Sequence, residues 1–124
     1  MRDEALRYHE GGKIQVVPKK RVSTKEELSL AYTPYVAKVS EEIMKDKNKV
    51  YRYTIKKNSV AVISDGSAVL GMGNIGSYSS IPVMEGKAML FKEFAQIDAF
   101  PICIKTQEER EIVNIVENIA PVFG

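Results

Sequence analysis

Two short apolar runs constrain the fold of this chain more than any other feature. Residues 60–63 read VAVI, and residues 99–104 read AFPICI. Runs of this length and composition are typical of buried strands. Between them, residues 82–96 repeat apolar side chains at helical spacing, and Pro82 suits the first turn of a helix. Together these elements predict an α/β domain.

The segment that follows the first run predicts a β-hairpin. Asp65-Gly66 is a two-residue turn signal, and it separates the first run from a further apolar run at residues 68–70. Upstream, residues 51–55 alternate apolar and polar side chains, as in a strand. The predicted fold is therefore a mixed sheet that contains a β-hairpin and is covered by helices.

Four further segments carry helix signals. Ser23 and Thr24, followed by Glu26 and Glu27, form a good helix start, because a hydroxyl cap and a carboxylate three residues on satisfy free amides of the first turn. Pro34 ends or kinks that helix. The other predicted helices cover residues 2–10, 35–45 and 108–119, and residues 13–22 form a connector or at best an edge strand.

Length and composition limit the functions open to the chain. Its 124 residues form one domain rather than two. With 18 basic and 16 acidic residues the net charge is only +2, which argues against nucleic acid as a partner. No apolar run approaches the roughly 20 residues needed to cross a membrane, and the N-terminus is charged, so we expect a cytoplasmic protein. Cys103, the single cysteine, lies in an apolar run and is expected to be buried and inert.

A glycine-rich motif follows the predicted hairpin. Residues 71–76 read GMGNIG and fit the dinucleotide fingerprint G-x-G-x-x-G. In that fingerprint the third glycine opens a helix, and an acid ends the next strand about 20 residues later. Here five more residues precede the predicted helix start at Pro82, and Gln96 stands where the acid belongs. The motif is therefore expected to be a structural or active-site turn rather than a cofactor site.

Two residues are candidates for proton transfer, each with a plain structural alternative. Lys87 falls in the second turn of the predicted helix, where the positive end of the helix dipole would favour a neutral amine that acts as a base. A lysine on an amphipathic helix is more often simply solvated. Tyr32 precedes a helix break, where a phenol can exchange a proton with a substrate or can instead cap the core. His9, the only histidine, has no second ligand nearby, so a metal role is not expected.

Taken together, five strings of the sequence resemble the N-terminal domain of the small prokaryotic malic enzymes. They read ELSLAYTP (27–34), VAVISDG (60–66), AVLGMGNIG (68–76), PVMEGKA (82–88) and IDAFPIC (97–103). The order and approximate spacing of the family are kept over nearly all of the chain. The resemblance implies oxidative decarboxylation of L-malate to pyruvate and CO2, with NAD or NADP as hydride acceptor and Mg2+ or Mn2+ as Lewis acid.

The resemblance also implies roles for individual residues. Tyr32 matches the general acid of the family, and Lys87 matches the base that takes the malate hydroxyl proton. Lys56 and Asn58 match a motif that could meet a substrate carboxylate, and Asn74 is a further candidate for substrate binding. In the family, the metal-ligating acids and the nucleotide-binding domain follow the segment that corresponds to residues 1–124. The resemblance therefore implies a truncated substrate domain that holds no cofactor and has no activity by itself, with the choice between NAD and NADP left open.

Three departures from the family pattern support a different hypothesis. Tyr35 and Lys57 stand at common glycine positions, and residues 77–80, SYSS, replace a loop usually written Pro-x-Ala-Gly. Exposed tyrosine and serine are typical of binding surfaces. An alternative is thus an engineered scaffold whose surface around Tyr35, Lys57 and Tyr78 binds a partner or itself. Because a cut domain exposes surface that its missing half would cover, a homodimer is expected.

Overall fold

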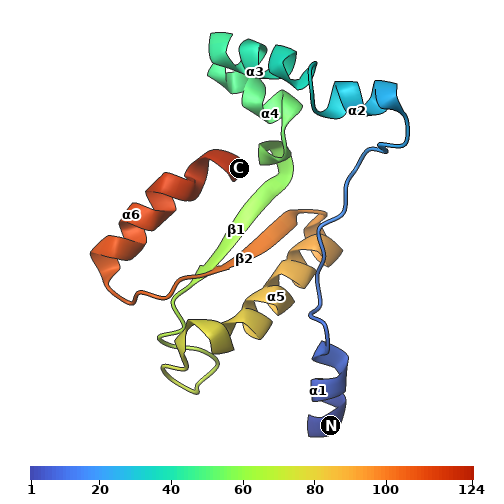
Figure 1. Cartoon of the computed structure of the whole chain (residues 1–124). Helices are drawn as coiled ribbons and strands as arrows, with labels where there is room; N and C mark the ends of the chain where they lie inside the picture. The colour runs from blue at the N-terminus through green and yellow to red at the C-terminus, as the bar shows by residue number, and fades with distance from the viewer.

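The computed structural model describes all 124 residues as an α/β fold in three parts (Figure 1). Two strands lie side by side at the centre, with α5 along one side and α6 along the other. Helices α2, α3 and α4 lie beyond the end of the strands, and α1 lies at the opposite end. The elements are α1 (Arg2–His9), α2 (Lys25–Ala31), α3 (Val36–Lys45), η1 (Lys47–Lys49), α4 (Val50–Tyr53), η2 (Ile55–Asn58), β1 (Ser59–Ser64), α5 (Gly76–Ala95), β2 (Asp98–Cys103), α6 (Glu109–Ile119) and η3 (Ala120–Val122).

The strands β1 and β2 pair in parallel, from Ser59 opposite Asp98 to Ser64 opposite Cys103. Parallel strands require a crossover connection, and α5 provides it by packing against both strands. The buried hydrophobic side chains of the molecule all lie in this region, which we call the sheet unit: β1, α5 and β2, with the connecting segment 65–75 and Ile104. They are Val62, Val69, Met84, Ala88 and Ile104. The strands predicted at residues 60–63 and 99–104 and the predicted α/β class are confirmed.

The predicted hairpin at Asp65-Gly66 is wrong. The sheet has only two strands, both parallel, and residues 68–70 form no strand. Instead, the carbonyl oxygen of Gly66 accepts hydrogen bonds from the amides of Ile75 and Gly76, at 2.9 and 3.2 Å, which closes the connecting segment on itself. Gly66 has a φ of +72°, and a Cβ there would lie 2.0 Å from the carbonyl oxygen of Gly76. The turn signal is therefore real, but it closes a loop rather than a hairpin.

A predicted strand and the predicted start of a helix are also wrong. Residues 51–55 are not a strand, because α4 and η2 occupy this segment, with Thr54 donating to the carbonyl of Val50 at 2.6 Å and accepting from the amide of Lys56 at 3.2 Å. Helix α5 begins at Gly76, six residues before Pro82, so the proline lies inside the helix. The remaining predicted helices, α1, α2, α3 and α6, are confirmed to within two residues, and residues 13–22 form an irregular connector. Cys103 ends β2 and is half-buried rather than buried.

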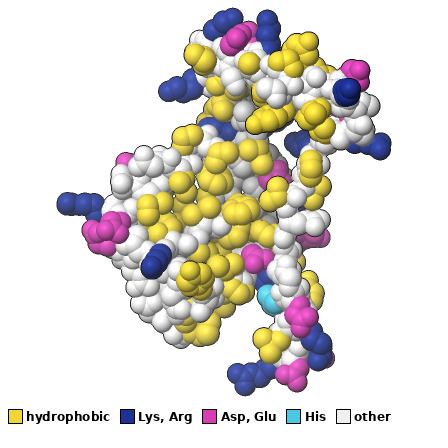
Figure 2. Space-filling view, viewed as in Figure 1, with side chains coloured by type: hydrophobic (Ala, Val, Ile, Leu, Met, Phe, Trp, Pro, Cys, Tyr) yellow, Lys and Arg dark blue, Asp and Glu magenta, His cyan; other side chains and the backbone are white.

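Residues 25–53, comprising α2, α3, η1 and α4, form a helical arm that contains no buried residue. Its first helix is capped by Thr24, whose hydroxyl oxygen accepts from the amide of Glu27 at 3.1 Å. The arm helices pack mainly on one another. Figure 2 shows hydrophobic side chains exposed on the arm and over the strands. None of the helices is both long enough and apolar enough to cross a bilayer.

Candidate functional site

Tyr32 lies at the C-terminal end of α2, where the chain turns towards α3. Its amide donates to the carbonyl of Leu28, and its own carbonyl accepts from the amide of Val36 at 2.8 Å. The backbone is thus fixed by local hydrogen bonds on both sides. The side chain is 68% exposed, and the phenol makes no hydrogen bond within the chain. The structural alternative of a tyrosine that caps the core does not apply to Tyr32.

Lys87 is the twelfth residue of α5 and is exposed. Because the helix begins at Gly76, the ammonium lies about three turns from the N-terminus, and the helix dipole acts only within the first turn. The expected second-turn position of Lys87, and the activation argued from it, are therefore wrong. The ammonium of Lys87 makes no ion pair within the chain. The carboxylate of Glu85, two residues earlier, instead accepts a hydrogen bond from the backbone amide of Lys13 at 2.7 Å.

Lys56 and Asn58 lie at the joint between the arm and the sheet unit. The ammonium of Lys56 donates to the carbonyl oxygens of Ala120, at 3.2 Å, and Phe123, and lies 5.4 Å from the ring centre of Tyr51. The amide of Asn58 donates to the carbonyl of Gln96 at 2.8 Å and to a carboxylate oxygen of Asp98 at 3.0 Å. Both polar groups are therefore engaged in holding segments of the chain together.

Asn74 lies in the glycine-rich segment and pairs with Gln107, a residue that no sequence motif singled out. The two side-chain amides bond reciprocally, each donating to the oxygen of the other at 2.9 Å. Gln107 also donates to the carbonyl of Asp65 at 3.2 Å, and the oxygen of Asn74 accepts from the amide of Gly76 at 3.2 Å. This network connects the segments that follow β1 and β2 to the start of α5. Spacing alone carries no signal for it, because the partners are 33 residues apart.

The residues present do not fit a dinucleotide at the glycine-rich segment. Gly76 does open α5, so the predicted interval of five loop residues is wrong. However, the amide of Gly76 already donates to the oxygens of Gly66 and Asn74, and the amide of Ile75 donates to Gly66. A pyrophosphate needs such amides free. In addition, β2 ends at Cys103 and carries no acid where the ribose ligand of the fingerprint belongs.

The residues present do not fit a divalent cation either. No group of three or more His, Cys, Asp or Glu side chains lies together. His9 is engaged locally, since its Nδ1 lies 2.7 Å from the carbonyl of Ala5 and its Nε2 lies 2.7 Å from the ammonium of Lys13. Asp65 accepts from the amide of Ser67 at 2.9 Å, and its hydrogen bonds to Ser67 lower its pKa. It therefore stabilises a turn.

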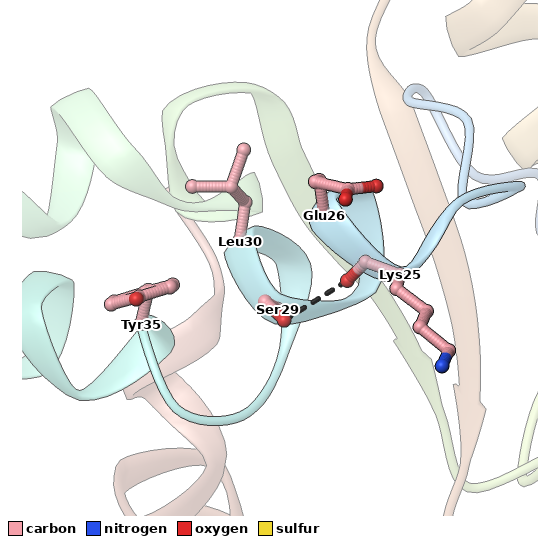
Figure 3. A pocket seen from close by; sticks show the side chains of 5 residues that line it. All are labelled: Lys25, Glu26, Ser29, Leu30 and Tyr35. Atoms are coloured by element: carbon pink, nitrogen blue, oxygen red, sulfur yellow. Dashed lines mark hydrogen bonds between the residues drawn. The ribbon is translucent and has the colours of Figure 1, made fainter.

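The three residues expected at an interface are all exposed. Tyr35 is the N-cap of α3 and lines a shallow hollow with side chains of α2, shown in Figure 3. Its φ is −83°, so a tyrosine at this position carries none of the left-handed strain that a replaced glycine would imply. Tyr78 lies in the first turn of α5 and is 84% exposed, and Lys57 lies in η2 at the joint. The hollow at Tyr35 includes neither Tyr32 nor Lys87.

The structure does not bring the two proton-transfer candidates together within one chain. Tyr32 lies in the arm at the end of α2, beyond the end of the strands, whereas Lys87 lies in the middle of α5 beside them (Figure 1). The arm helices make no extensive contact with α5. Within one copy, two separate exposed groups are present rather than one assembled site.

The fold defines this chain as an α/β domain with a parallel β–α–β unit and a protruding helical arm. Comparison with known families matches residues 11–117 to the malic enzyme N-terminal domain. The chain belongs to this family.

Relatives of known sequence and structure agree with this assignment. The chain is 57% identical over 122 residues to an NAD-dependent malic enzyme of Geobacillus stearothermophilus and 48% identical to an NADP-dependent malic enzyme of Escherichia coli. These alignments cover 98% and 100% of this chain but only 26% and 17% of the relatives. The crystal structure of a malic enzyme from Pyrococcus horikoshii superimposes with a TM-score of 0.97 at 55% identity, over 99% of this chain and 30% of that one.

Proposed function

We propose that this chain is the substrate-binding and proton-transfer part of a malic enzyme, which oxidatively decarboxylates L-malate to pyruvate and CO2 with NAD or NADP in the cytoplasm. The observation that carries the proposal is the match of residues 11–117 to the malic enzyme N-terminal domain, a range that includes Tyr32 and Lys87. Relatives with names of both NAD- and NADP-dependent enzymes match over the same region, so the match leaves the choice of dinucleotide open.

In this proposal Lys87 is the base and Tyr32 is the acid. Lys87 takes the proton of the C2 hydroxyl of malate, and the dinucleotide, when bound, would accept the hydride of C2. After CO2 departs, the phenol of Tyr32 delivers a proton to C3, which gives pyruvate. The structure supports the proposal because both side chains are accessible to a substrate: each is exposed, and neither makes a hydrogen bond within the chain. Lys56, Asn58 and Asn74 are the proposed substrate-binding residues, and within the chain their side chains make the hydrogen bonds described above.

We propose further that the isolated chain does not turn malate over. Hydride acceptance belongs to the dinucleotide and Lewis-acid chemistry to Mg2+ or Mn2+, and the residues of this chain form neither site. The chain also spans only about a quarter of the NAD-dependent relative.

The test is malate-dependent reduction of NAD and NADP by the longer protein that contains this domain. Lys87→Ala and Tyr32→Phe are each expected to lower kcat by roughly 10²- to 10⁴-fold, the size of a general acid–base contribution, with a much smaller change in KM. Lys38→Ala and Tyr53→Phe are matched controls in the arm and should leave kcat unchanged. Undetectable malate oxidation by the unmodified protein, or full activity of both site variants, would overturn the proposal.

A second candidate function rests on Tyr35 and Tyr78, two exposed aromatic side chains without hydrogen bonds in the chain. Under this alternative the domain is an engineered scaffold, and the surface around Tyr35, Lys57 and Tyr78 mediates binding to a partner or to itself. The two candidates separate in the longer protein. A malic enzyme oxidises malate whether or not Tyr78 is replaced by alanine, whereas a remodelled scaffold shows no malate oxidation and loses its binding.

A further inference from the structure

The side chains of His9 and Lys13 are in contact where α1 ends. The ammonium nitrogen of Lys13 lies 2.7 Å from Nε2 of His9, and the contact is exposed to solvent. Two glycines produce it, since Gly11 and Gly12 have φ values of +81° and +84°, in the left-handed region that residues with a Cβ rarely adopt. They turn the chain sharply after the helix, so Lys13 returns to the last turn of α1.

The hydrogen bonds of His9 determine which ring nitrogen carries a hydrogen. Nδ1 lies 2.7 Å from the carbonyl oxygen of Ala5, which can only accept a hydrogen bond. Nδ1 therefore carries the hydrogen, and Nε2 of the neutral ring has a free electron pair that accepts from the ammonium of Lys13. Imidazole takes up and releases protons near neutral pH, so Nε2 is a base in direct contact with the amine of Lys13.

The amine of Lys13 makes only one other hydrogen bond, to the carbonyl oxygen of Pro82 at 2.8 Å, and no ion pair. An ammonium group has three hydrogens, so one side of the nitrogen has no acceptor in the chain. Lys49 differs, because its ion pair with Glu42 at 2.6 Å raises its pKa and holds it in the unreactive ammonium form. His9 is the single histidine, so no other lysine of the chain has an imidazole beside it.

We propose that Lys13 is a site of acylation by activated acyl groups, namely acyl thioesters and acyl phosphates, with His9 as the general base. The neutral amine of Lys13 attacks the carbonyl carbon from its open side, and a C–N bond forms. The bond from that carbon to sulfur or to the phosphate oxygen breaks, and the leaving group takes the bonding electrons. The proton lost by nitrogen passes to Nε2 of His9, and the products are an amide and a free thiol or phosphate. This reaction is separate from the malate chemistry and involves neither Tyr32 nor Lys87.

Acylation changes how α1 is attached to α5. An amide nitrogen carries one hydrogen and no charge, so an acylated Lys13 no longer donates to both His9 and Pro82. Helix α1 has no buried residue, and the backbone bond from the amide of Lys13 to Glu85 at 2.7 Å is then the main bond that ties its end to α5. The modification therefore loosens α1 from the sheet unit.

Site-resolved mass spectrometry of the chain, incubated with acetyl-coenzyme A or with acetyl phosphate in separate arms, tests the reactivity. Lys38 is the internal control, because it is exposed and makes neither a hydrogen bond nor an ion pair. The initial rate of acetylation at Lys13 should exceed that at Lys38 by about tenfold with at least one reagent, at the low end of general-base effects because the site is open to water. Equal rates at the two lysines in both arms would overturn the proposal.

A substitution of His9 separates a base from a mere hydrogen-bond acceptor. His9→Gln keeps an oxygen that can accept from Lys13 but removes the base, so acetylation of Lys13 should slow to the rate of Lys38, whose own rate stays the same. Tyr8→Phe, on the same helix, is the matched control and should leave both rates unchanged. Rapid acetylation of Lys13 in the His9→Gln chain would show that His9 is not the base.

Amide hydrogen exchange tests the structural consequence. In the acetylated chain and in Lys13→Gln, which carries a neutral amide at the same position, the amides of α1 should exchange faster than in the unmodified chain. Lys38→Gln is the control and should leave the exchange of α1 unchanged. If acetylation leaves the exchange of α1 as it is in the unmodified chain, Lys13 does not control the attachment of this helix and that part of the proposal is wrong.

Discussion

The sheet unit and the helical arm are built from equally clear local signals, yet only one of them has a core. In the sheet unit, α5 lies against two strands and buries Met84 and Ala88, to 9% and 2% exposure. In the arm, α3 has apolar residues at the same helical spacing and buries none of them. An amphipathic pattern therefore predicts a helix but not the surface that packs against its apolar face. That surface belongs to elements distant in sequence.

Local interactions hold the arm together in place of a core. Its strongest ion pair joins Lys49 to Glu42 at 2.6 Å, and a second contact joins Lys45 to the same carboxylate at 3.6 Å. The hydrogen bond and the charge of Lys49 lower the pKa of Glu42, and Glu42 in turn raises the pKa of Lys49. Exposed pairs of this kind stabilise a fold only slightly. These ion pairs therefore contribute little to the free energy that holds the arm in place.

The largest expected effect is at the turn that closes the sheet unit. Gly66→Ala should destabilise the chain by about 3 kcal/mol or more, because a Cβ there would lie 2.0 Å from the carbonyl of Gly76 at a positive φ. Gly71→Ala is the matched control, since its φ is similar but nothing lies within 4 Å of the added Cβ, and it should cost about 1 kcal/mol. Urea unfolding measures both variants. If both variants lose the same free energy of unfolding, the backbone around Gly66 and Gly76 can move apart to accommodate a Cβ.

A pair of methionines compares the two regions directly. Met84→Ala removes a buried side chain of α5 and should lower the free energy of unfolding by about 2–4 kcal/mol. Met44→Ala removes a side chain of α3 that is 84% exposed and should change that free energy by less than about 0.5 kcal/mol in the monomer. Thermal unfolding at low protein concentration checks both values. A large loss for Met44→Ala that grows with concentration would place Met44 in the contact between copies.

A substitution of Tyr35 tests whether the arm takes part in self-association of the chain. If the arm packs on a second copy, Tyr35→Gly should weaken self-association about tenfold, since an exposed aromatic side chain in a packed interface contributes more than 1 kcal/mol. Sedimentation across a concentration series measures the dissociation constant. Tyr8→Gly serves as the control, because Tyr8 is an exposed tyrosine of α1, outside the arm. An unchanged mass distribution for Tyr35→Gly would leave this residue outside any interface.

The smallest effect is a pH dependence at the edge of the sheet unit. Hydrogen bonds from Lys92, at 2.8 Å, and from Asn58 lower the pKa of Asp98 below its ordinary value of 3.8. The folded pKa is thus below the unfolded one, so the stabilisation is complete above about pH 4 and is lost as the pH falls through the folded value. Asp98→Asn should cost less than about 1 kcal/mol at pH 7, because the pair is partly exposed, and should flatten the acid limb of the stability curve. A variant whose stability below pH 4 falls as steeply as that of the unmodified chain would assign the acid loss to other groups.

The elements that the sequence predicted correctly are those whose signals are local. The cap at Thr24, the break at Pro34 and the apolar spacing of residues 108–119 each act within a few residues, and the structure confirms the corresponding helices. The apolar runs around Val62 and Ile102 likewise predicted β1 and β2. Two of the errors have a common cause, since the turn at Gly66 and the alternation at residues 51–55 were assigned to strands whose partners do not exist.

The sequence by itself determined α1, α2, α3 and α6, the two strands and the family, because periodicity, capping and motif strings are properties of neighbouring residues. Only the tertiary structure decided which edge of β1 meets β2, the pairing of Asn74 with Gln107, and the distance of the arm from α5. These features depend on contacts between residues far apart in the chain, whose free energy no local pattern records. The separation of Tyr32, at the end of α2, from Lys87, in the middle of α5, belongs to this second group.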